Sequence, residues 1–156
     1  MRYGWRIASP EFSQNHDQML NGEGAFLYGG RWSSKGVRVV YLGSSLAQAS
    51  MELLVHLGRA DVLKNYRVTR LSFDEGLMEH IDLNDLPEDW KAPTLAPAIQ
   101  AVGDAWIAAA SSLILQVPSA AVAGEYNYLL NPRHPDMDKV GLGPITPYQF
   151  DPRILK

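Results

Sequence analysis

The segment from Val37 to Leu57 reads VRVVYLGSSLAQASMELLVHL and decides the centre of the fold. Its first part, from Val37 to Leu42, is apolar and rich in β-branched residues, with a glycine on each side, which is typical of a buried strand. Its second part spaces leucines as a helix does, and Ser44 or Ser45 stands before it as an N-cap. We therefore expect a strand that leads directly into a helix ending near Leu57.

The rest of the chain predicts further short strands and two more helices. Alternating or apolar runs predict strands at residues 3–8, 66–73, 79–83, 113–117, 126–130 and 144–150. Helices are expected at about residues 11–20, where Gly22 and Gly24 prevent a continuation, and at 98–111. Three prolines between residues 86 and 97 indicate a surface loop with a short helical turn. The chain is thus expected to mix α and β structure.

Composition limits the classes of function. A chain of 156 residues without repeats or a linker predicts one domain, residues 1–156. A net charge of -3 gives no basic surface for independent binding to nucleic acid. Without cysteine the chain has no disulfide, thiolate zinc site or cysteine nucleophile, and its four histidines lack metal-ligand spacing. Because we find neither a signal peptide nor an apolar run that could cross a membrane, we expect a cytoplasmic protein.

The first group of candidate site residues begins within the stretch Tyr28-Gly-Gly-Arg-Trp32. Arg31 offers a planar fork of donors that suits phosphate, and the two glycines let the backbone approach a ligand closely. Tyr41 adds an aromatic ring, and Glu52 adds a carboxylate. This set suits a ligand with phosphates, a flat ring and a centre that becomes cationic, as in a nicotinamide dinucleotide.

Each of these residues also has an ordinary structural explanation. Glu52 shares a narrow polar strip of its helix with Gln48, so it could simply face solvent. The glycines before Arg31 could form a turn with an exposed arginine, and Trp32 fits a core position. Tyr28 and Tyr41 could likewise be ordinary sheet residues.

A second group lies near the predicted strands of the C-terminal half. Ser119 follows Val117-Pro118, so its hydroxyl is expected at a strand edge. No Gly-x-Ser-x-Gly surrounds it, which argues against a hydrolase nucleophile. It could bind a ligand amide or phosphate, or it could stabilise a turn. Asn131 precedes a proline and is a common turn former.

In this order, the motifs together resemble the RES domain family, which is named for an arginine, a glutamate and a serine. The matching stretches are Tyr28-Gly-Gly-Arg-Trp32, Tyr41, Ala49-x-x-Glu52, Val117-Pro118-Ser119 and Asn127-x-x-x-Asn131-Pro132-x-His134-Pro135. One departure is Ser33, where we expect asparagine. Both Arg6 and Arg31 could be the family's arginine, and we favour Arg31.

The resemblance implies an α+β fold related to ADP-ribosyltransferases. It would be a single compact domain with a mixed, mostly antiparallel β core and flanking helices. The implied function is that of a toxin in a bacterial type II toxin–antitoxin system, which degrades NAD⁺ by hydrolysis or phosphorolysis. Some relatives instead transfer ADP-ribose to a protein. A non-catalytic binding module is a third and less favoured alternative.

The resemblance also implies partners and roles. The partner would be an Xre-type antitoxin with a helix-turn-helix domain, which would make the DNA contacts. NAD⁺, with inorganic phosphate as a candidate second substrate, would be consumed without any prosthetic group or metal. Apart from the resemblance, exposed apolar surface around the alanine-rich helix from Ala98 to Ala110 could serve a homodimer or the antitoxin.

Within such a site, the resemblance gives each candidate residue a role. Glu52 would stabilise the developing ribose cation, and Arg31 would clamp the pyrophosphate. Tyr28 and Tyr41 would contact the nicotinamide ring. The other wall of the pocket would come from Ser119 and Asn131.

Overall fold

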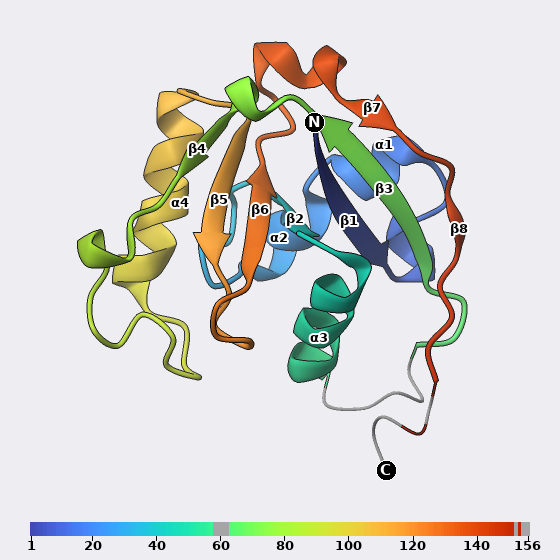
Figure 1. Cartoon of the computed structure of the whole chain (residues 1–156), viewed down its shortest axis with the longest axis horizontal. Helices are drawn as coiled ribbons and strands as arrows, with labels where there is room; N and C mark the ends of the chain where they lie inside the picture. The colour runs from blue at the N-terminus through green and yellow to red at the C-terminus, as the bar shows by residue number, and fades with distance from the viewer. Residues whose placement is uncertain (58–62, 152, 154–156) are drawn as a thin grey trace.

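One eight-stranded sheet organises the part of the chain that the computed structural model describes, residues 1–57, 63–151 and 153. The strand order is β4-β5-β6-β2-β1-β3-β7, and β8 pairs with β3 (Figure 1). The β4–β5 pair is parallel, and the other pairs are antiparallel. The strands are β1 (Arg2–Ala8), β2 (Val40–Gly43), β3 (Arg67–Phe73), β4 (Met78–His80), β5 (Ile114–Pro118), β6 (Tyr126–Leu130), β7 (Gly141–Leu142) and β8 (Thr146–Pro147).

Four α-helices and four 3-10 helices flank the described sheet. Figure 1 shows α3 in front of it and α1 and α2 behind it. The α-helices are α1 (His16–Leu20), α2 (Glu23–Tyr28), α3 (Leu46–Leu57) and α4 (Pro97–Ala109). The 3-10 helices are η1 (Pro10–Phe12), η2 (Glu75–Leu77), η3 (Leu83–Asp85) and η4 (Pro135–Lys139). None of the described helices is long and apolar enough to span a membrane.

The sheet curls around one hydrophobic core, which we call the shared core because strands from both ends of the sheet contribute to it. It includes Leu42, Phe73 and Tyr128. The rings of Phe73 on β3 and Tyr128 on β6 meet edge to face with centroids 5.3 Å apart. Because β1 and β2 lie between these strands, a flat sheet would separate them by about 14 Å. Met19 and Leu20 of α1 pack into the same core. The inner face of the curl is therefore filled by side chains.

The other face of the sheet carries α3 and α4. Alternation along β2 sends Val40 and Leu42 into the shared core and Tyr41 and Gly43 to the other face. There α3 packs through Ala49 and Leu54, in a cluster that includes Ile7, Val68 and Tyr148. Ile99 and Trp106 of α4 pack against Leu115, Val117 and Leu129. The two helices thus cover neighbouring parts of one surface.

Several predicted boundaries differ from the observed ones. The predicted strand at 37–42 begins only at Val40, and of residues 11–20 only the last five form an α-helix, after Asn15 caps it. We did not predict α2, because Gly22 and Gly24 looked like helix breakers. Gly22 instead occupies the N-cap position with φ +72°, where a side chain would be strained. The expected strand at 144–150 is reduced to Thr146–Pro147.

Candidate functional site

Three side-chain donors converge on one oxygen of Glu52. The Glu52 Oε1 atom accepts hydrogen bonds from Gln48 Nε2 at 3.1 Å, Asn127 Nδ2 at 3.0 Å and Ser119 Oγ at 2.5 Å. Glu52 itself is half-buried on α3. The carboxylate is thus part of a fixed polar cluster rather than a freely solvated surface group.

The strand–helix junction that the sequence predicts places this cluster. Ser45 Oγ accepts from the Gln48 backbone N–H at 3.0 Å and caps the start of α3. A Cβ on Gly43 would lie 2.5 Å from the backbone nitrogen of Ala49, so only glycine lets α3 approach β2 this closely. In the sheet, Asn127 pairs with Gly43. The polar strip of α3 therefore meets the start of β6.

Ser119 has the turn-stabilising role that its sequence context allowed, together with a contact to Glu52 that the sequence did not predict. Its Oγ donates to Glu52 and accepts from the backbone N–H groups of Ala121 (3.2 Å) and Val122 (3.0 Å). These bonds use the one donor and both lone pairs of a hydroxyl. Ser119 is only 4% exposed. It stabilises a turn and holds Glu52 at the same time, and a direct ligand contact would require one of these bonds to break.

The Tyr41 hydroxyl holds the glycine–arginine loop, residues 29–33, in place. Its hydroxyl accepts from the Trp32 backbone N–H at 3.1 Å and shares a hydrogen bond with Ser33 Oγ at 2.8 Å. Burial raises the pKa of Tyr41 to about 12, against the lowering effects of the Ser33 and Trp32 hydrogen bonds and the Arg31 charge. The phenol is therefore neutral at physiological pH. Trp32 is 2% exposed, which confirms its predicted core position.

The Arg31 guanidinium is held through one of its nitrogens, Nη1. Its Nη1 donates to the backbone oxygens of Trp90 at 3.0 Å and Ala92 at 2.9 Å, in the loop before α4. From α4 itself, Gln100 Nε2 donates to the Gly30 oxygen at 3.0 Å. These contacts use both N–H groups of Nη1 and do not involve Nε and Nη2. That second edge has the geometry for two parallel hydrogen bonds to a phosphate.

Arg31, Tyr41 and the Glu52 cluster form one band on the outer face of the sheet. Tyr41 is paired with Leu129, so Asn127 is its diagonal neighbour on the same face, at about 7–8 Å. The Tyr41 hydroxyl contacts the backbone on both sides of Arg31, and the Arg31 charge lowers the pKa of this phenol. Arg31 is thus next to Tyr41, and Tyr41 is next to Asn127 of the Glu52 cluster. We take this band as the candidate site.

Two predicted site residues, Asn131 and Tyr28, are not among the side chains that bond Glu52. Asn131 is four positions beyond Asn127, about 13 Å along the strand direction. Its Oδ1 accepts from the Arg133 backbone N–H at 3.1 Å, so it stabilises the turn that leaves β6. Tyr28 ends α2 with 68% of its surface exposed. Asn131 is therefore remote from Glu52, whereas Tyr28 lies three residues before Arg31 with its side chain exposed.

Arg6, the other candidate for the family's arginine, is also remote from the band. By alternation along β1 it shares the face of Ala8, which belongs to the shared core. Its Nε donates to the Met19 oxygen at 3.2 Å, and burial lowers its pKa to about 10. Arg31 is the arginine that lies beside Tyr41.

We assigned no role to Gln48 or Asn127 from the sequence. Gln48 lies four residues before Glu52, a spacing that makes contact between helical side chains. Asn127 is the first residue of the motif that also contains Asn131. This spacing and this motif were visible in the sequence. The contact between the two amides depends on the strand order, which was not.

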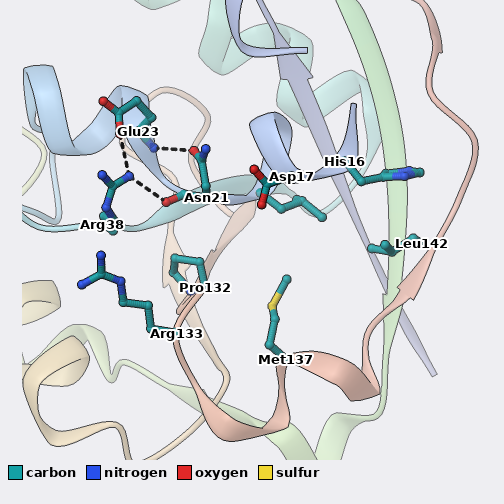
Figure 2. A pocket seen from close by; sticks show the side chains of 10 residues that line it. His16, Asp17, Asn21, Glu23, Arg38, Pro132, Arg133, Met137 and Leu142 are labelled. Atoms are coloured by element: carbon teal, nitrogen blue, oxygen red, sulfur yellow. Dashed lines mark hydrogen bonds and ion pairs between the residues drawn. The ribbon is translucent and has the colours of Figure 1, made fainter. Parts of the chain in front are cut away.

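A separate groove lies on the opposite side of the sheet. It encloses about 480 Å³, and its walls include Leu20 of the shared core and the turn after β6. Figure 2 shows Asp17 and Met137 pointing into it, while Arg38 is engaged with Glu23 and with Asn21. The Arg38–Glu23 ion pair measures 2.6 Å. None of the predicted site residues lines this groove.

No group of three or more histidine, aspartate or glutamate side chains within residues 1–57, 63–151 and 153 is placed to hold a metal ion.

Comparison with known proteins gives a consistent family. A family model described as the RES domain matches residues 4–151. The chain is 37% identical over 137 residues to Toxin Res of Photorhabdus laumondii subsp. laumondii, covering 87% of this chain and 88% of that protein. It is 31% identical over 155 residues to a Prs ADP-ribosylating toxin of Sphingobium sp., covering 97% and 96%.

The fold is similar to that of a solved chain. A chain in the crystal structure of the M. tuberculosis MbcT–MbcA toxin–antitoxin complex superposes with a TM-score of 0.76 at 20% identity, covering 99% of this chain and 86% of that one. At this identity the likeness concerns the fold. The predicted α+β class, with a mixed and mostly antiparallel sheet, is confirmed.

Proposed function

This chain belongs to the RES domain family, and from that premise we propose that it is the toxin of a bacterial type II toxin–antitoxin system that cleaves the nicotinamide–ribose bond of NAD⁺. Two similar proteins carry toxin names, and one of them is named for ADP-ribosylation, a reaction in which NAD⁺ donates the ADP-ribose. Hydrolysis or phosphorolysis of NAD⁺ is the form of the reaction that we favour.

The observation that carries this proposal is the fixed carboxylate of Glu52 in a band with Arg31 and Tyr41. Cleavage of the bond builds positive charge on the ribose, as in glycoside cleavage through an oxocarbenium-like transition state. A preorganised negative charge beside that ribose stabilises the transition state more than the ground state. Nicotinamide leaves as a neutral base, so no general acid is required.

The remaining residues of the band fit the rest of the substrate. The Nε–Nη2 edge of Arg31 would bind the pyrophosphate, and the Tyr41 ring would contact the nicotinamide. In this scheme Ser119 acts by holding Glu52. Asn131, which is remote from Glu52 and stabilises the turn after β6, would take no part in the cleavage step. Tyr28, exposed and three residues before Arg31, would contact the nicotinamide ring.

The test is to incubate the purified protein with NAD⁺ and to quantify nicotinamide by chromatography. We expect release that depends on enzyme concentration. Parallel reactions with and without inorganic phosphate identify the acceptor, because phosphorolysis gives a phosphorylated ADP-ribose and hydrolysis gives ADP-ribose. Absence of nicotinamide under both conditions would contradict the proposal.

A second candidate is transfer of ADP-ribose to a protein, which the similarity to the Sphingobium toxin favours. Transfer leaves ADP-ribose covalently attached to a macromolecule, whereas degradation leaves only small products. Mass spectrometry of a treated lysate therefore separates the two reactions.

We further propose an Xre-type helix-turn-helix antitoxin as the protein partner, with the toxin acting in the cytoplasm, where it reaches NAD⁺. The toxin names of the similar proteins support a dedicated inhibitor. Co-purification with a co-expressed antitoxin, followed by light scattering, would test the complex and show whether the toxin is also a homodimer.

A further inference from the structure

The side-chain amides of Gln48 and Asn127 form a closed arrangement with Glu52. Gln48 Nε2 donates to Glu52 Oε1 and also to Asn127 Oδ1, each at 3.1 Å. Asn127 Nδ2 donates to the same Glu52 oxygen at 3.0 Å. Each amide thus fixes the orientation of the other, because only one assignment of the Asn127 nitrogen and oxygen satisfies both contacts.

We propose that Gln48 and Asn127 are positioning residues for the NAD⁺-cleaving step: together they occupy Glu52 Oε1 and leave Oε2 as the oxygen that faces the ribose. This inference rests on the proposed function. It also assigns work to two residues that the arginine, glutamate and serine of the family motif do not include.

The acceptor capacity of a carboxylate supports this division of labour between its two oxygens. Each oxygen presents about two lone-pair directions. Oε1 already receives three donors, counting Ser119, so it has no free direction for a substrate hydroxyl. The charge that stabilises the ribose cation must then act through Oε2, whose direction is set when Oε1 is held.

The surroundings make this arrangement rigid. Gln48 is 3% exposed and Ser119 is 4% exposed, so water competes little for their hydrogen bonds. Glu52 and Gln48 share α3, while Asn127 and Ser119 come from β6 and from the end of β5. The carboxylate is therefore clamped between a helix and the sheet. Displacement of a reacting group by about 1 Å can cost on the order of 10²-fold in rate.

The test uses near-isosteric variants that lack the donors: Gln48→Met, Asn127→Leu and the double variant. Steady-state nicotinamide release is measured and referred to the folded fraction, which circular dichroism gives. We expect each single variant to lower kcat by about tenfold or more while KM for NAD⁺ stays within about threefold, the pattern of an interaction made in the transition state. The double variant should lose little more than the worse single variant, because the two amides act as a unit.

The matched control is Gln14→Met, which removes an exposed amide that donates to the Pro10 oxygen at 2.7 Å. This variant also loses one amide hydrogen bond, but far from Glu52 in the sequence and on another element, and it should keep the wild-type kcat. A purely structural role for Gln48 and Asn127 would instead lower the melting temperature without changing kcat per folded molecule.

A crystal structure of the double variant gives a readout that does not depend on activity. We expect Glu52 to leave its present orientation. A double variant with kcat within threefold of wild type, or with Glu52 unmoved, would overturn the positioning role. Absence of nicotinamide release by the wild-type protein would overturn the proposed function alone, and the orientation of Glu52 in the double variant would still decide the positioning.

Discussion

Gly30 is a residue of the candidate site that has no space for a side chain. A Cβ at this position would lie 2.5 Å from the Tyr41 hydroxyl oxygen. That hydroxyl holds Trp32 and Ser33, and Arg31 lies between them and Gly30. A side chain here must therefore displace either the tyrosine or the loop that carries the guanidinium.

We expect Gly30→Ala to lower the free energy of unfolding by about 1–3 kcal/mol, the usual cost of forcing an extra group into a packed site. It should also raise KM for NAD⁺, because the arginine moves. Urea denaturation and steady-state kinetics measure the two effects. Gly24→Ala is the control, since a Cβ there meets no atom within 4 Å and an alanine favours helix α2 by up to about 1 kcal/mol. Equal stability of the two variants would contradict the close packing.

Tyr41 makes a prediction about pH at the same scale. Burial raises its folded pKa to about 12, above the ordinary value of 10.0. Below pH 10 the phenol is neutral in both folded and unfolded chains, so its contribution is fully present. Between about pH 10 and 12 the unfolded chain loses this proton and the folded chain retains it, so stability falls as pH rises.

Tyr41→Phe should remove this component, so the wild-type protein should lose more stability than the variant between pH 9.5 and about pH 11. A folded-state pKa of about 12 against 10.0 corresponds to about 3 kcal/mol of stability at its limit, and part of that loss should be visible in urea titrations at high pH. Taking the difference between the two proteins cancels the titration of the other groups. Parallel pH curves would show that the Tyr41 hydroxyl is not shielded as the structure indicates.

At the scale of elements, the start of α3 decides where Glu52 lies. Ser45 Oγ accepts the Gln48 N–H at 3.0 Å, and no other side chain of the described chain is seen to bond that group. Ser45→Ala should lower the free energy of unfolding by about 1 kcal/mol, whereas Ser45→Gly should cost only a few tenths. Denaturant titration of both variants tests the cap. A loss from glycine as large as that from alanine would contradict it.

Helices α2 and α3 differ in how well the sequence predicted them. The junction of β2 and α3 was predictable because a β-branched apolar run, a glycine, a serine cap and a helical leucine pattern all lie within one short segment. By contrast, α2 was missed because its two glycines are poor helix formers by local propensity. Gly22 is in fact required for the left-handed turn that starts that helix.

At the scale of the whole molecule, the candidate site depends on contacts that local patterns do not encode. Ser119 and Asn127 lie 67 and 75 positions after Glu52 in the sequence. They meet Glu52 because β6 pairs between β5 and β2, a strand order that local periodicity does not determine. For the same reason Asn131, which the motif groups with Asn127, lies at the opposite end of β6.

The curled sheet also separates the two surfaces that could bind ligands. The groove shown in Figure 2 lies on the side of α1, whereas the band with Glu52 lies under α3 and beside α4. Curling fills the inner face with Phe73 and Tyr128, so polar groups on the outer face have no path through the core. The proposed cleavage of NAD⁺ therefore takes place on the outer face of the sheet.

We propose that the carboxylate of Glu52 drives cleavage of the nicotinamide–ribose bond. The most direct test is the rate of nicotinamide release from NAD⁺ by the wild-type protein and by Glu52→Gln, measured side by side. The glutamine oxygen can still accept from Gln48, Asn127 and Ser119, so the substitution removes mainly the negative charge. We predict release by the wild-type protein and a loss on the order of 10²-fold or more in the variant. A variant as fast as wild type would contradict the role of Glu52, and no release by either protein would contradict the proposed reaction.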